Sequence, residues 1–152
     1  MQYTITPESP NTSDAVALIA ELEAHLEPSY PRESRHGLSV AQLIDQAVAF
    51  FLLRVEGEPI GCGGVKFFGT EYGEIKRMYV RPQFRGRGFA RAMLDWLAAY
   101  SRAQGIFLLR LETGIYQQEA IGLYEKVGFT RIPPFGDYKV DPLSVFFEKR
   151  IE

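Results

Sequence analysis

The stretch Val80-Arg81-Pro82-Gln83-Phe84-Arg85-Gly86-Arg87-Gly88-Phe89-Ala90 joins a strand to a long helix through a short loop with two glycines. The preceding segment, Gly73–Val80, has the pattern of a strand, and apolar residues recur at helical spacing from Gly86 to Gln104. The first N–H groups of a helix have no partner within it and lie at the positive end of its dipole. Glycines let a ligand approach the backbone closely. The junction therefore indicates a phosphate-binding site.

Two common phosphate-binding motifs do not fit this junction. A dinucleotide-binding G-x-G-x-x-G motif needs a third glycine where this chain has Arg91. The P-loop string G-x-x-x-x-G-K-[ST] occurs nowhere in the sequence. The pattern that remains is Q-x-x-G-x-G, formed by Gln83, Gly86 and Gly88.

Charge is unevenly distributed around the junction. The net charge of −2 predicts no strong attraction to nucleic acid or to an anionic membrane. Six of the 17 basic residues nevertheless fall between positions 76 and 91, with no acid among them: Lys76, Arg77, Arg81, Arg85, Arg87 and Arg91. Such a cluster favours an anionic ligand, because arginines donate charge-assisted hydrogen bonds. The segment Pro7–His36 has the opposite balance, with more acids than bases.

The remaining segments predict one domain over residues 1–152, with the element order β-α-α-β-β-β-α-β-α-β-β. Short turns predict antiparallel hairpins, whereas the strand–helix–strand segment around Gly86–Gln104 predicts a right-handed parallel crossover. We therefore expect a mixed α/β (α+β) fold. Its sheet is expected to be mostly antiparallel with one central parallel strand pair, and to carry helices on both faces.

Composition excludes several other classes. Cys62 is the only cysteine, so an internal disulfide and a cysteine-rich zinc site are excluded, and His25 and His36 lack the pairing expected of metal ligands. We expect no metal. No apolar run approaches the roughly 20 residues that span a bilayer. The N-terminus lacks the pattern of a secretory signal, so the expected location is cytoplasmic.

At three places the chain resembles the GNAT superfamily of N-acetyltransferases. Gln83, Gly86 and Gly88 match the family's [Q/R]-x-x-G-x-[G/A] loop; Glu74–Val80 is similar to its fourth strand; Ala120–Phe129 matches A-x-x-L-Y-x-x-x-G-F. The resemblance covers roughly residues 50–132. It implies an acetyl-CoA-binding core there, and an acceptor pocket shaped by the region of about residues 12–47.

The resemblance also implies catalytic roles. Tyr124 is implied as the acid that protonates the leaving thiolate, although its helical spacing alone favours a core residue. Glu74 is a candidate base, because the acceptor's ammonium must lose a proton before it attacks and a carboxylate near the strand end can take it through water; a solvated edge-strand acid or an ion pair with a nearby lysine is its structural alternative. Glu112 is a rival candidate for the base; its structural alternative is a carboxylate that accepts a hydrogen bond within the fold. The segment Phe135–Tyr138 is a candidate border of the acceptor pocket.

The residues implied to bind acetyl-CoA lie along the loop and the two strands beside it. The main-chain N–H groups of Arg85 to Ala90 are expected to hold its phosphates, and a backbone N–H near Met78–Val80 is expected to polarise the thioester. Gln117 stands where many relatives have an asparagine that contacts the pantetheine arm. The full set is Met78, Val80, Gln83, Arg85, Gly86, Arg87, Gly88, Phe89, Ala90 and Gln117.

The function expected from this resemblance is acetyl transfer from acetyl-CoA to a primary amine of a small molecule or amino acid. Direct attack is expected, because Cys62 lies on a strand away from the motif. The alternatives are a non-catalytic acyl-CoA sensor and a protein or peptide N-acetyltransferase. The acidic segment Pro7–His36 slightly favours a cationic amine. Dimers are common among similar proteins, so a homodimer is a candidate oligomeric state.

Overall fold

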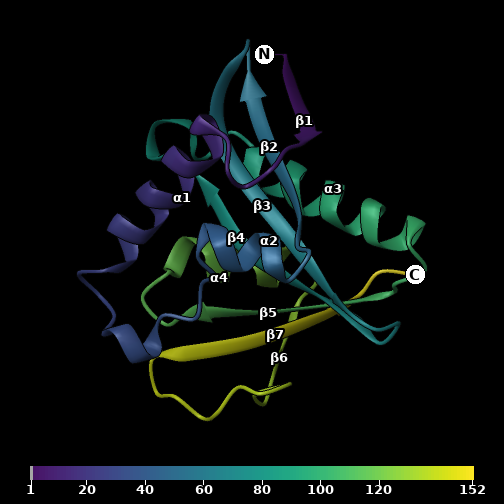
Figure 1. Ribbon diagram of the computed structural model, residues 1–152. Helices are drawn as coiled ribbons and strands as arrows, with labels where there is room; N and C mark the ends of the chain where they lie inside the picture. The colour runs from purple at the N-terminus through teal and green to yellow at the C-terminus, as the bar shows by residue number, and fades with distance from the viewer. Residues whose placement is uncertain (1) are drawn as a thin grey trace.

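The computed structural model describes residues 2–152 and has the predicted order of strands and helices (Figure 1). Two single turns of 3-10 helix, η1 at Arg32–Ser34 and η2 at Pro82–Phe84, are additional. The regular elements are β1 (Tyr3–Pro7), α1 (Ser13–Leu26), α2 (Val40–Asp45), β2 (Ala49–Val55), β3 (Glu58–Phe68), β4 (Tyr72–Val80), α3 (Phe89–Ala103), β5 (Leu108–Gly114), α4 (Gln118–Lys126), β6 (Thr130–Ile132) and β7 (Ser144–Arg150).

Local sequence explains where the helices begin. The Thr12 hydroxyl accepts the N–H of Ala15 and caps α1, and Ser39 forms a reciprocal capping box with Gln42 at the start of α2. Helix α3 begins differently, because its N-cap is Gly88 and no side chain caps it.

The strands form one seven-stranded sheet in the order β1-β2-β3-β4-β5-β7-β6. Only the β4–β5 pair is parallel, and every other neighbouring pair is antiparallel. The predicted mixed, mostly antiparallel sheet with one central parallel pair is therefore confirmed.

Helices cover both faces of the sheet, as predicted. On one face, α1 and α2 pack through Leu18 and Leu43 against a core that also holds Phe50 and Leu52 of β2. On the other face, α3 and α4 pack on a larger core that contains Phe51 and the alternate residues of β2. Figure 1 shows α1 and α2 on the opposite side of the strands from α3.

Strand β4, in the middle of the sheet, pairs irregularly with both of its neighbours. It pairs with β5 only at Gly73 with Leu109 and Glu74 with Arg110, so beyond these residues the two strands no longer pair. Its pairing with β3 shifts between Cys62 and Gly64, where β4 carries one additional residue. The bulge falls at Arg77, whose φ of 54° lies in the left-handed region.

Candidate active site

A cavity of about 130 Å³ lies where β4 and β5 diverge. Residues 74–78 of β4 and 111–114 of β5 form two of its walls. Side chains from α1, from the segment after it, from α4 and its N-cap, and from the segment before β7 complete it: Leu22, Leu26, Tyr30, Ser34, Arg35, His36, Gln117, Ala120, Tyr124 and Tyr138. The structure thus brings Glu74, Glu112 and Tyr124 to one cavity.

Tyr124 on α4 is both a core residue and a cavity residue. Its side chain is 6% exposed, and its ring packs against Phe129 and Phe147 at centroid distances of 5.6 and 6.1 Å. Burial, together with the negative charge of Glu112, raises the pKa of the Tyr124 hydroxyl above its ordinary value. The hydroxyl is therefore protonated at neutral pH and can serve as an acid.

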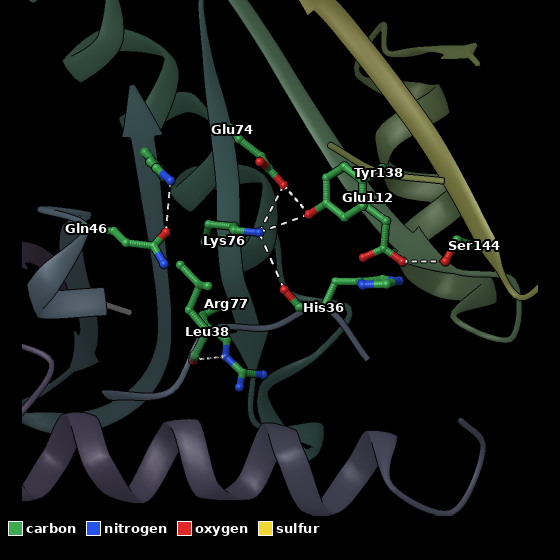
Figure 2. Close-up of polar contacts among 10 residues, drawn as sticks. His36, Leu38, Gln46, Glu74, Lys76, Arg77, Glu112, Tyr138 and Ser144 are labelled. Atoms are coloured by element: carbon green, nitrogen blue, oxygen red, sulfur yellow. Dashed lines mark hydrogen bonds and ion pairs between the residues drawn. The ribbon is translucent and has the colours of Figure 1, made fainter. Parts of the chain in front are cut away.

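Glu74 is held in a compact network with Lys76 and Tyr138 (Figure 2). Its Oε2 accepts hydrogen bonds from the Tyr138 hydroxyl at 2.5 Å and from the Lys76 ammonium at 3.0 Å. The same ammonium donates to the Tyr138 oxygen at 3.0 Å and to the His36 carbonyl at 3.5 Å. The structural alternative, an ion pair with a nearby lysine, is thus present. Of the segment Phe135–Tyr138, which is expected to border the acceptor pocket, Tyr138 lines this cavity.

Glu112 on β5 stands apart from this network. Its Oε2 accepts a hydrogen bond from the Ser144 hydroxyl at 2.8 Å, as Figure 2 shows. Burial raises the pKa of this carboxyl above its ordinary value, and the hydrogen bond from Ser144 offsets that effect only in part. A carboxylate with a raised pKa is better matched to accept a proton near neutral pH than an ordinary one.

The glycine loop at the start of α3 has the features of an anion site. Gly86 and Gly88 have φ values of 76° and 85°, and a Cβ on either would meet no atom within 4 Å. The Arg85 N–H already donates to the Pro82 carbonyl at 3.2 Å, so the expected set of donors needs correction at that residue. Within residues 2–152, the N–H groups of 86–90 have no such backbone acceptor. Gln83 is exposed.

Folding neutralises half of the basic cluster. Lys76 pairs with Glu74, Arg77 with Glu23 at 2.6 Å, and Arg81 with Glu21 at 2.8 Å. The acids that pair with the two arginines, Glu21 and Glu23, come from α1, so these two carboxylates are already engaged within the chain. The cations left beside the glycines are Arg85, Arg87 and Arg91. Of these, Arg85 donates from Nε to the Val80 carbonyl at 2.9 Å.

Gln117 and Met78 lie in the cavity, whereas Val80 lies in the core beside it. The Gln117 side-chain oxygen accepts a hydrogen bond from the Tyr30 hydroxyl at 3.3 Å. The NH₂ group of Gln117 therefore remains available to donate to another acceptor. Tyr30 also accepts the Tyr116 N–H at 2.9 Å. Its ring packs so closely on Gly114 that a Cβ there would lie 2.1 Å from the hydroxyl oxygen.

Sequence reasoning missed Tyr30, Arg35 and Ser144 as site residues. Tyr30 and Arg35 lie in a proline-bearing segment, where no periodicity indicates which side chains turn inward. Ser144 begins β7 and reaches Glu112 across an antiparallel pair. Only a known strand order would have singled it out.

Cys62 does not share the cavity. It is 1% exposed, its thiol donates to the Arg77 carbonyl at 3.2 Å, and burial raises its pKa to about 12. Among residues 2–152, no group of three or more His, Cys, Asp or Glu side chains is arranged to hold a metal ion. In the same part of the chain, no helix is both long and apolar enough to cross a membrane.

Comparisons with known proteins agree with this geometry. Residues 17–129 match the family described as the acetyltransferase (GNAT) family. The IAA acetyltransferase of Azospirillum brasilense is 44% identical over 148 residues, which is 96% of each chain. A solved structure from Klebsiella pneumoniae, assigned as an acyl-CoA N-acyltransferase, is 39% identical with a TM-score of 0.88 and 99% of each chain covered.

A further solved structure shares the fold at lower identity. It is a GNAT family acetyltransferase of Elizabethkingia anophelis with acetyl-CoA bound, 19% identical with a TM-score of 0.72 over 97% of each chain.

Proposed function

This chain belongs to the acetyltransferase (GNAT) family and is an N-acetyltransferase, and on that premise we propose the donor, the acceptor and the residues of its reaction. The donor is acetyl-CoA and the acceptor is a primary amine of a small molecule or amino acid, attacked without an acyl-enzyme. One observation carries the proposal: a cavity lined by Tyr124, Glu74 and Glu112 lies at the divergence of β4 and β5.

The glycine loop fits the diphosphate of acetyl-CoA. A donor set that can hold it comprises the N–H groups of residues 86–90, since they lie at the uncapped N-terminus of α3 and have no backbone acceptor among the described residues. Arg85, Arg87 and Arg91 add positive charge. The Gln117 NH₂ is a donor for the pantetheine arm. The cosubstrate itself supplies an activated acetyl thioester.

A carboxylate in the cavity accepts the proton that the acceptor's ammonium must lose. Glu74 was the first candidate on sequence. The contacts favour Glu112, because Oε2 of Glu74 already accepts from both Lys76 and Tyr138. Glu112 accepts from Ser144 alone, and its pKa is raised by burial.

The proton for the leaving thiolate comes from Tyr124. Its hydroxyl is protonated at neutral pH, and the residue lines the same cavity as Glu112. Main-chain N–H groups of β4 near Met78 to Val80 are the donors for the thioester oxygen, because this part of the strand has no partner in β5.

The proposal is tested by incubating the protein with acetyl-CoA and a panel of amines, amino acids and peptides. We expect release of free thiol together with a product heavier by one acetyl group, detected by mass spectrometry. Protein unfolded by heat and reactions without acceptor are the controls. Tight calorimetric binding of coenzyme A with no acetylated product from any acceptor would contradict the proposed transfer. If coenzyme A gives no heat of binding, the assignment of the glycine loop as its binding site is refuted.

The cytoplasmic location and the homodimer remain predictions from the sequence. Sedimentation of the protein over a range of concentrations measures its oligomeric state.

A further inference from the structure

The charged side chains around the cavity are not evenly compensated. Lys76 has no capacity left for a ligand, because its three ammonium protons point to Glu74, the Tyr138 hydroxyl and the His36 carbonyl (Figure 2). Glu74 and Lys76 cancel as a pair at 3.0 Å. A ligand in the cavity must therefore be recognised by other charges.

One end of the cavity carries an excess positive charge. Glu23 is shared by two guanidinium groups, at 3.1 Å from Arg35 and 2.6 Å from Arg77. Arg77 also donates from Nε to the Leu38 carbonyl at 2.9 Å and has a side chain only 4% exposed. One carboxylate facing two guanidinium groups leaves a net charge of +1 at this corner.

Arg35 is the member of this group that keeps an unused hydrogen-bond donor. It lines the cavity, and its Nε is buried with no hydrogen-bond partner anywhere in residues 2–152. Leaving a buried donor unsatisfied costs about 1–3 kcal/mol. An acceptor atom supplied by a ligand removes that cost, and a carboxylate matches the planar guanidinium best.

Glu112 carries the complementary negative charge on the β5 wall. No ammonium or guanidinium group of the described residues lies within ion-pair distance of it, and Ser144 is its one hydrogen-bond partner. His36 also lines the cavity and lies 4.0 Å from Asp141; it acts on Glu112 electrostatically but does not lie within ion-pair distance of it. The cavity thus offers a cation that shares its one carboxylate partner with a second guanidinium, and an anion that has no ion-pair partner among the described residues.

We propose that the acceptor is an amino acid, whose amine faces Glu112 and whose free carboxylate binds Arg35. Leu22, Leu26 and Tyr30 line the same cavity, so an apolar side chain fits between the two charges. The inference rests on the proposed function, because it names the acceptor class of that same cavity. Plain alkylamines and lysines within proteins lack the free carboxylate that Arg35 requires.

The experiment compares acceptors that differ by one carboxylate. L-leucine is paired with isoamylamine, L-phenylalanine with phenethylamine and 6-aminohexanoate with pentylamine. For each pair, the ratio of kcat/KM values is measured in the unmodified protein, in Arg35→Gln and in Arg32→Gln. Arg32 is the matched control, since it is an exposed arginine three residues earlier that does not line the cavity.

We expect the amino acid to be the better acceptor in at least one pair. Losing a charge-assisted hydrogen bond in Arg35→Gln lowers the ratio by about 10- to 100-fold, and Arg32→Gln leaves it unchanged. If Arg35→Gln is too unstable to assay, Arg35→Lys keeps the charge without the planar fork and gives a smaller fall. Equal ratios in all proteins, or better turnover of the decarboxylated amines, would overturn the proposal.

Calorimetric titration with L-leucine separates this inference from the proposed function. Binding that is weakened in Arg35→Gln and kept in Arg32→Gln supports the carboxylate site even without acetyl transfer. Transfer to amines with no dependence on Arg35 refutes the carboxylate site and leaves the acetyltransferase reaction intact.

Discussion

Replacing Gly88 by alanine tests whether the main chain at the start of α3 holds coenzyme A. Gly88 has a φ of 85° and a Cβ there meets nothing within 4 Å, so the substitution introduces backbone strain without a steric clash. An L-residue in the left-handed region costs about 1–2 kcal/mol. For a chain of this size we expect Tm to fall by about 2–8 °C.

Gly105 provides a matched control at the opposite end of the same helix. Its φ is 79°, a Cβ there also meets nothing within 4 Å, and the residue is exposed. Gly105→Ala therefore suffers the same strain far from the loop. The two variants are expected to lose similar stability and to differ in ligand binding.

The difference in binding follows from the hydrogen bonds of the loop. Relaxation of residue 88 toward negative φ turns neighbouring N–H groups away, and each charge-assisted hydrogen bond lost costs about 1.5–3 kcal/mol. Loss of one such bond weakens coenzyme A binding by about 10- to 150-fold. Calorimetry measures Kd and circular dichroism measures Tm for both variants. Unchanged Kd in Gly88→Ala, or equal weakening in Gly105→Ala, would refute the assignment.

Three further predictions concern the cavity and the buried thiol. Tyr124→Phe should lower kcat by about 10²-fold or more, whereas Tyr100→Phe on α3 should not; equal rates in both variants and the unmodified protein, from pH 6 to 9, would exclude the acid role. Burial raises the pKa of Glu112, so kcat/KM should rise with pH along a limb above the ordinary value of 4.5. That limb should vanish in Glu112→Gln and persist in Glu74→Gln; the reverse result assigns the base to Glu74. Cys62, with a pKa raised from 9.0 to about 12, should alkylate about 10³-fold more slowly at pH 8 in the folded than in the unfolded chain; rapid labelling of the folded protein would be inconsistent with its burial.

The order of elements could be predicted because its signals are local. Helical and alternating apolar spacing, Thr12 and Ser39 as caps, and glycines at turns each act within a few residues. The ends of the helices and strands are predicted less accurately than their order. The central helix begins at Phe89 and not at Gly86, because Gly88 takes a left-handed conformation. The end of β5 at Gly114 depends on its pairing with Ser144 of β7, which no local signal indicates.

The site was predictable only where one motif carries it. The glycine loop and the tyrosine of α4 are each recognisable in a short string of sequence. The ion pair of Arg81 with Glu21 joins residues 60 positions apart in the sequence. Ion pairs neutralise half of the basic residues at positions 76–91, although no acid lies among them in the sequence. The buried donor of Arg35 and the partner of Glu112 likewise depend on long-range packing.

The bulge at Arg77 decides which of the two cores each later residue of β4 enters. Ile75 points into the core under α3 and α4, and Tyr79, four positions later, points into the core under α1. Residues four apart on a regular strand share a face, so the additional residue inverts the parity of everything that follows it. A regular ladder that kept every residue of β4 and lacked the bulge would send Tyr79 toward α3 and Val80 toward α1, exchanging a phenol and a small alkyl group between the two cores. The left-handed conformation of Arg77 is therefore a condition for both faces of this sheet to fill.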